Sequence, residues 1–277
     1  MEKAIDIGKY VEIIVKWLTT HLRPFFDFIK TTGNTGIESL EWVFVHTPFY
    51  VMIILLALIA WRQAGKGMGA FTLLGLLLIY FMGFWTETMQ TLALIISSTV
   101  IALIIAIPLG IWAAKNHAAN KVIRPILDLM QTMPAFVYLI PAVLFFSIGK
   151  LPGAFATIIF AMPPAVRLTT LGIQQVPKDV IEASRSMGAT SKQILFKVEL
   201  PLAIKTILTG VNQTILLSLS MVVIAGMIAA GGLGEKVLEG INNLDIGLGF
   251  ESGLSVVILA IILDRITQAF GNRGIKK

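Results

Sequence analysis

The chain has 277 residues, of which 56% are hydrophobic and 14% charged, with a formal net charge of +6 and a mean hydropathy of +0.84. A water-soluble domain carries about 25% charged residues to cover its surface, so this composition excludes a soluble globular protein. The chain contains no cysteine, which excludes disulfides, thiolate nucleophiles and cysteine-based metal sites.

Residues 1–42 predict an extracellular tail with an amphipathic helix. Apolar side chains recur there at three- and four-residue spacing, with charges between them: Ile7, Tyr10, Ile14, Trp17 and Leu18 around Lys9, Glu12 and Lys16. This pattern suits a helix on the outer membrane surface or, equally, one packed against a transmembrane bundle. Segment 31–36 (TTGNTG) is typical of a flexible joint between the tail and the membrane domain.

From residue 43 to residue 270 the chain predicts an all-α, polytopic membrane domain. Apolar runs of about 17–25 residues, long enough to cross a hydrocarbon core of about 30 Å, recur along it. We expect about seven transmembrane helices, near 43–61, 68–85, 89–114, 127–148, 151–171, 204–230 and 252–270. Pro48 and the pair Pro163-Pro164 make the first and fifth the least regular.

The distribution of charge predicts the orientation. Lysine and arginine gather in loops 61–67 and 115–127, in segment 167–205 and at the C-terminus, whereas the opposite loops carry Lys150 and Lys236 beside several carboxylates. By the positive-inside rule the N-terminus lies outside and the tail 271–277 lies in the cytoplasm. The positive charge therefore reports topology, and we expect a lipid bilayer and no nucleic acid as partner.

The fourth predicted span contains two prolines, Pro134 and Pro141, on nearly the same face. Each removes a backbone hydrogen bond, which suits a helix that lines a pathway or flexes, although static kinks are equally compatible. Tyr138 and nearby aromatic side chains could attract a quaternary ammonium group, but aromatic residues at this spacing are more often core.

Segment 172–203, between two apolar runs, predicts two short cytoplasmic helices. Pro177 can open the first, and Gly188 supplies a turn at which a Cβ would be costly. Thr190 or Ser191 can cap the second, which we expect Pro201 to end. Such a pair, parallel to the bilayer, is suited to docking in a cleft of a cytosolic subunit.

Polar residues in the sixth predicted span also need partners. Asn212, Ser218 and Ser220 must face other helices or a wet cavity, because lipid offers their polar groups no hydrogen-bond partner. Interhelical hydrogen bonds are the more common role of such residues, and lining a pathway is the alternative. Asp128 and Asp264 lie near cytoplasmic ends beside Arg124 and Arg265, and simple charge pairing is expected. No carboxylate is evident at mid-membrane.

The spacing E-A-S-x3-G-x9-V-x-L-P, formed by Glu182, Ala183, Ser184, Gly188, Val198, Leu200 and Pro201, resembles the EAA coupling loop of ATP-binding-cassette (ABC) importer permeases. Ser184 replaces the second alanine and Val198 an isoleucine. Longer runs resemble the glycine betaine/proline betaine class within that family: 126–138 (ILDLMQTMPAFVY), 160–164 (FAMPP), 219–225 (LSMVVIA) and 231–234 (GGLG). The resemblance covers most of residues 85–270.

The resemblance implies a type I importer fold in a bacterial inner membrane and a role in osmoprotection. It also implies a second permease copy, two ATPase subunits contacted through the 182–201 loop, and a separate external binding protein. Sequence 1–277 contains no G-x-x-x-x-G-K-[ST] phosphate loop, so ATP and Mg²⁺ are expected on the partner ATPase, with no catalytic residue, metal or cofactor in this chain.

Three alternatives remain open. A permease for another small solute, such as an amino acid, choline or carnitine, would carry the same loop. A secondary transporter or channel would need intramembrane carboxylates or internal repeats, which the sequence lacks. A membrane enzyme would need clustered ligands, but His21 and His46 are predicted outside and His117 inside.

Overall fold

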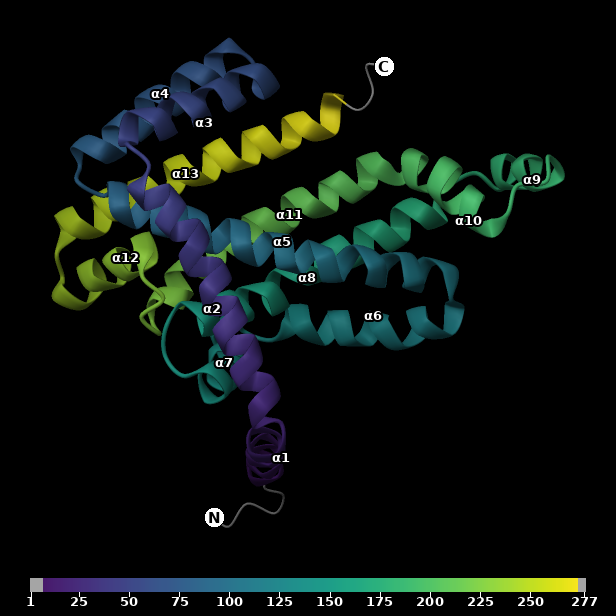
Figure 1. The fold of residues 1–277 in the computed structure, drawn as a ribbon, viewed down its shortest axis with the longest axis horizontal. Helices are drawn as coiled ribbons and strands as arrows, with labels where there is room; N and C mark the ends of the chain where they lie inside the picture. Colours follow the sequence, from purple (N-terminus) through teal and green to yellow (C-terminus); the bar gives the residue numbers. More distant parts are fainter. Residues whose placement is uncertain (1–6, 274–277) are drawn as a thin grey trace.

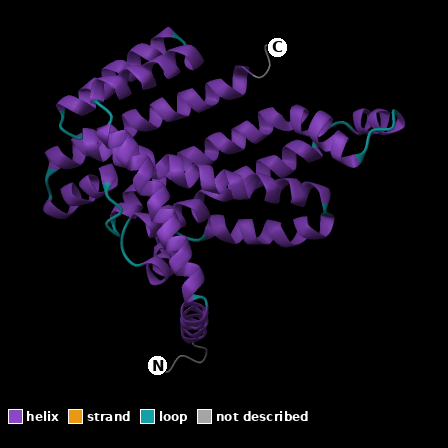
Figure 2. Cartoon of the chain, viewed as in Figure 1, coloured by secondary structure: helices purple, strands orange, loops and turns teal. Residues whose placement is uncertain are grey.

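The computed structural model describes residues 7–273, and side-chain surroundings for most of them. Every regular element in this range is helical, as the sequence predicted, and short loops join the helices (Figures 1 and 2). The elements are α1 (Ile7–His21), α2 (Arg23–His46), α3 (Phe49–Ala64), α4 (Lys66–Phe81), α5 (Trp85–Lys115), α6 (His117–Thr132), η1 (Ala135–Tyr138), α7 (Leu139–Phe146), α8 (Lys150–Gln174), α9 (Lys178–Ser186), α10 (Ser191–Ile194), η2 (Leu195–Glu199), α11 (Leu200–Gly226), α12 (Gly232–Asn243) and α13 (Ile246–Arg273).

The centre of the molecule is a bundle of three long helices, α5, α8 and α11 (Figure 1). Small residues bring these helices together, as is common where lipid provides no hydrophobic drive. A Cβ on Gly110 of α5 would lie 2.6 Å from the Cβ of Thr169 on α8. A Cβ on Gly210 of α11 would lie 3.1 Å from the Cα of Ala165. These glycines therefore set how closely the helices approach.

The number of membrane spans is four to six among the described helices. Four of them, α5, α8, the continuous stretch Ser191–Gly226 and α13, are long and apolar enough to cross a bilayer alone. Two bent pairs, α2 with α3 and α6 with η1–α7, pass the same test together, and α4 is a shorter apolar helix of 16 residues. The polytopic all-α fold is thus confirmed, but with four to six candidate spans and not the predicted seven. The first predicted span, 43–61, is broken at Thr47 and Pro48, where α2 and α3 meet at 103°.

The fourth predicted span, 127–148, is not one continuous helix. α6 and the η1–α7 helix meet at 109°, with the break at Met133 and Pro134, both in extended conformation. The ring of Pro134 excludes Met133 from the helical conformation, so α6 ends there. Pro141 lies beyond the break, inside α7. The two prolines therefore do not mark successive kinks on one face.

The predicted flexible joint at 31–36 is also wrong. α2 runs without interruption from Arg23 to His46. A Cβ on Gly33 would lie 2.6 Å from Leu151 Cδ1, so this glycine allows α2 to pack closely against the start of α8. Ile37, one turn further along α2, is buried in the core. The predicted boundary between residues 42 and 43 falls within α2, which crosses the bundle (Figure 1).

α1 is helical, as its spacing predicted, and leaves Tyr10, Ile13 and Trp17 more than half exposed. Glu12 accepts a hydrogen bond from Lys16, which lowers the pKa of the Glu12 carboxyl. The side-chain surroundings of Ile7, Lys9 and Ile14 lie outside the described residues, as do residues 1–6 and, in the predicted cytoplasmic tail, residues 274–277.

Candidate coupling loop and translocation pathway

The first half of the predicted coupling loop forms α9, which projects beyond the ends of α8 and α11 (Figure 1). Pro177 stands at its N-cap in extended conformation, as predicted. Glu182 and Ala183 are exposed, and the hydroxyl of Ser184 donates to the carbonyl of Val180. Glu182 makes no ion pair with Arg185 or any other described residue, so its carboxylate is free for a partner.

Gly188 makes the turn that follows α9. Its φ of +83° lies in the left-handed region, which a side chain with a Cβ rarely adopts. Met187, just before it, is 89% exposed, and Phe196 is 64% exposed. The loop therefore presents a free carboxylate and large apolar side chains at the same end of the molecule, a composition suited to a protein contact.

The second half of the loop continues directly into the membrane. Thr190 caps α10 in a capping box with Gln193, as predicted. Pro201 does not end the helix, because the π-helical turn η2 precedes it and the N–H of Leu200 donates to Leu195 O, five residues back. This wider turn accommodates the proline, so α10, η2 and α11 form one helix of 36 residues.

An ion pair that the sequence did not predict fixes this junction. Glu199, in η2, has only 3% of its side chain exposed and pairs through Oε2 with the ammonium of Lys115 at the end of α5. Lys115 is the only basic side chain in the described part of the chain that pairs with Glu199, so it is the group that compensates this buried charge. The pair joins the root of the coupling loop to the central bundle.

The residues predicted to line a pathway have diverse surroundings. Tyr138 is 7% exposed and donates a hydrogen bond of 2.6 Å to the carbonyl of Met130, across the break at Pro134. Ser218 is fully buried and accepts from the hydroxyl of Thr99 on α5 at 3.1 Å. Ser220 is exposed, and among the described residues it bonds only back to Leu216 within its own helix.

Two predicted charge pairs involve different partners. Asp128 pairs with Arg167 of α8 at 2.5 Å, not with Arg124 of its own helix. Asp264 accepts hydrogen bonds from Asn212 of α11 at 3.1 Å and from Gln268, not from Arg265. The contact with Asp264, together with one from Thr267 to Asn212, places Asn212 in an interhelical network between α11 and α13.

At the opposite end of the bundle, a network ties α2 to the start of α12. Glu41 accepts from Lys150 at 2.6 and 2.8 Å and from Gln90 at 3.2 Å. Gln90 in turn accepts from the N–H of Gly232. In α12, the hydrogen bond with Glu239 raises the pKa of the Lys236 ammonium. The described residues contain no cluster of three or more His, Asp or Glu side chains that could hold a metal.

Comparison with known proteins identifies the family. The family described as "Binding-protein-dependent transport system inner membrane component" matches residues 106–275. The chain belongs to this family. Its members are inner membrane components of transport systems, in agreement with the polytopic fold.

Relatives in this family resemble the chain over nearly its whole length. It is 52% identical over 267 residues to the glycine betaine/proline betaine transport system permease protein ProW of Escherichia coli (strain K12), covering 96% of this chain and 75% of ProW. It is 47% identical over 264 residues to the glycine betaine transport system permease protein OpuAB of Bacillus subtilis (strain 168), covering 95% and 94%.

Two further comparisons extend this likeness. The glycine betaine/carnitine transport permease protein GbuB of Listeria monocytogenes serotype 1/2a (strain 10403S) is 48% identical over 274 residues, which cover 98% of this chain and 97% of GbuB. Among solved structures, an inward-facing MetNI methionine ABC transporter chain superposes with a TM-score of 0.59 at 25% identity, over 69% of this chain and 93% of that chain. The fold is that of a type I ABC importer permease.

Proposed function

We propose that this protein is the permease subunit of an ABC importer that takes up glycine betaine or a closely related compatible solute across a bacterial inner membrane for osmoprotection. The observation that carries the proposal is the identity of 47–52% to permeases named for glycine betaine transport, over 95% or more of the chain. Carnitine, which appears in the names of two relatives, and choline or an amino acid are the alternative substrates.

The coupling loop is the proposed contact with the ATPase. α9 projects from the bundle with the side chains of Glu182 and Met187 exposed, and Glu182 makes no ion pair with any described residue. Because α10, η2 and α11 are one continuous helix, a displacement of the loop acts directly on a membrane span. The importer would consist of two copies of this chain, two ATPase subunits that hold ATP and Mg²⁺, and an external binding protein.

The sequence predicted Pro134, Tyr138, Pro141, Asn212, Ser218 and Ser220 as pathway residues, and among these we favour Pro134 and Ser220. The break at Pro134 supports a mobile element at this depth, and exposed Ser220 is the polar side chain best placed to meet a passing solute. The hydrogen bonds of Asn212 and Ser218 favour packing roles for these two. A weak, transient contact suffices if the binding protein supplies the affinity.

Uptake of labelled glycine betaine tests the proposal. The permease would be reconstituted in proteoliposomes with its ATPase and binding protein, with and without internal ATP, and with carnitine, choline and proline as competitors. Uptake that needs both ATP and the binding protein supports the importer and the betaine. ATP-dependent uptake of another solute would retain the importer and reject the betaine, whereas flux through the permease alone would reject both.

A further inference from the structure

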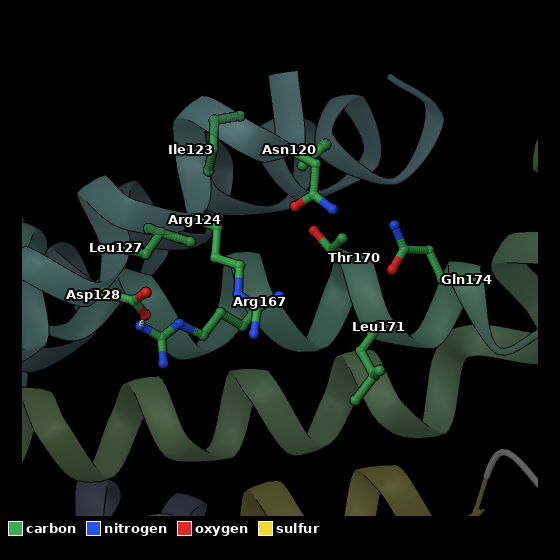
Figure 3. Close-up of a pocket in the computed structure, with 10 residues that line it drawn as sticks. Asn120, Ile123, Arg124, Leu127, Asp128, Arg167, Thr170, Leu171 and Gln174 are labelled. Carbon is green, nitrogen blue, oxygen red and sulfur yellow. Dashed lines mark hydrogen bonds and ion pairs between the residues drawn. The ribbon is translucent and has the colours of Figure 1, made fainter. Parts of the chain in front are cut away.

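A cavity of about 290 Å³ lies between α6 and α8, near the base of the coupling loop. Figure 3 shows side chains from the two helices facing each other across it. Its apolar floor includes the buried Ala113 of α5 and Leu127 of α6. Its polar lining comes from both helices: Asn120, Arg124, Asp128, Arg167, Thr170 and Gln174. The cavity therefore combines a dry floor with a polar, charged rim.

The charge of this rim is unbalanced. Arg167 pairs with Asp128 at 2.5 Å, and this pair is neutral overall. Arg124, one turn before Asp128 on α6, makes no ion pair or side-chain hydrogen bond with any described residue. One guanidinium next to the cavity therefore has no counter-ion within the described part of the chain, and it is exposed, so an anionic ligand can reach it.

Several hydrogen-bond donors around the cavity also lack acceptors. Nε of Arg167 is buried and has no hydrogen-bond partner among the described residues. The side-chain amides of Asn120 and Gln174 are likewise unbonded within that part of the chain. Thr170 differs, since its hydroxyl donates to the carbonyls of Gly110 and Val166. Gln174 is exposed and Asn120 is partly exposed, so water satisfies their amides. The buried Nε of Arg167 is the donor whose missing acceptor is unfavourable, and it points to an acceptor supplied from outside the chain.

We propose that the cavity is an oxyanion site that binds a phosphate group. A guanidinium presents its N–H groups in a planar fork that matches a phosphate, and here two guanidinium groups from different helices border one cavity. The ten residues that line the cavity all lie in the described part of the chain, and none of them is aromatic. The cavity therefore offers no cation–π surface to a quaternary amine. The site is therefore distinct from one for the transported solute.

The depth of the cavity makes it accessible to two sources of phosphate. Its floor residue Ala113 lies two positions before the end of α5, and α6 begins at His117 after a short connection. In the predicted topology this level is the cytoplasmic headgroup region, where basic pockets between helices bind anionic lipids. A soluble phosphate compound could reach the same rim from the cytoplasm. Both sources share the phosphate chemistry.

A phosphate held by Arg124 and Arg167 would bridge α6 and α8. α8 leads through Gln174 and Pro177 into α9, so this bridge would lie directly at the root of the coupling loop. Binding would stabilise the native state to a degree set by the ratio of ligand concentration to dissociation constant. It would also favour the relative position of α6 and α8 seen in the structure.

Thermal unfolding of the purified full chain, delipidated in neutral detergent, tests the proposal. The protein would be titrated with phosphatidylglycerol, with inorganic phosphate, and with a neutral glycolipid, which carries no phosphate, as a control. Arg124→Gln is the main variant, because Arg124 has no partner among the described residues whose loss would disturb folding. Lys121→Gln is the matched control, since it removes the same charge from the same helix at an exposed position outside the cavity.

We expect phosphatidylglycerol to raise the Tm of the parent chain and of Lys121→Gln, and Arg124→Gln to need at least tenfold more lipid for the same rise. Arg124→Lys, which keeps the charge but loses the planar fork, should fall between them. A matching response to inorganic phosphate would identify a site open to soluble ligands, and a response to the lipid alone a headgroup site; both support the proposal. Equal weakening by Lys121→Gln, or no stabilisation by either phosphate source, would overturn it.

Discussion

The ion pair between Lys115 and Glu199 provides the most quantitative test of how the coupling loop is anchored. Substituting Lys115→Met leaves the Glu199 carboxylate 3% exposed and without a cation. Breaking a fully buried pair by removing one partner costs about 3–5 kcal/mol. Lys115 is 41% exposed, so water reaches the site and reduces the cost. We therefore expect a loss of about 2 kcal/mol, or roughly 30-fold in the folding equilibrium at about 1.4 kcal/mol per factor of ten.

A double-mutant cycle separates this interaction from general damage. Glu199→Gln removes the buried charge, so its cost should be smaller, about 1 kcal/mol for an imperfectly paired buried amide. In that background Lys115→Met should cost nearly nothing, which gives a coupling energy of about 2 kcal/mol between the two residues.

Reversible unfolding of the purified protein in mixed detergent micelles, followed by circular dichroism, measures the four free energies. If Lys115→Met costs the same in the parent chain as in the Glu199→Gln background, the pair contributes nothing and the anchoring argument fails. A Lys115→Met variant as stable as the parent would refute the argument equally.

Three further outcomes are expected. Gly188→Val forces a β-branched residue to a φ of +83°, and it should abolish ATP-driven uptake while the complex still assembles. Gly65→Val, at a φ of +99° in the α3–α4 turn, is the control and should retain uptake. Gly110→Ala places a Cβ 2.6 Å from that of Thr169 and should cost about 1–3 kcal/mol by unfolding, whereas Gly253→Ala, with open space around it, should be nearly neutral. The chain has no cysteine, so a single introduced cysteine reports its own side of the membrane. Met187→Cys should react with a membrane-impermeant maleimide only from the cytoplasmic side and Ile246→Cys only from outside, since both positions are more than 85% exposed. Labelling from the reverse sides would show that the predicted topology is inverted.

Local signals in the sequence determined much of the coupling loop. Pro177 at a helix start, the left-handed turn at Gly188 and the Thr190 cap each act within a few residues, so their pattern is sufficient to predict them. The same holds for the helical character of most of the apolar runs, because length and hydropathy are local properties. The resemblance carried by these segments also gave the family that the comparison established.

Tertiary structure decided which groups meet. Asp128 has Arg124 one turn away, yet it pairs with Arg167, 39 residues further along the chain, because α8 packs beside α6. Pro201 was predicted to end a helix, but a π-turn five residues long accommodates it. Gly33 suggested flexibility and instead allows α2 to pack against Leu151.

These outcomes have one physical cause. A residue's conformational preference is written in its own side chain and its immediate neighbours, whereas its partners are chosen by the packing of helices that lie far apart in the sequence. The sequence by itself therefore determined the helices, the caps and the family. Only the tertiary structure placed Lys115 against Glu199 and brought two arginines to the edge of one cavity.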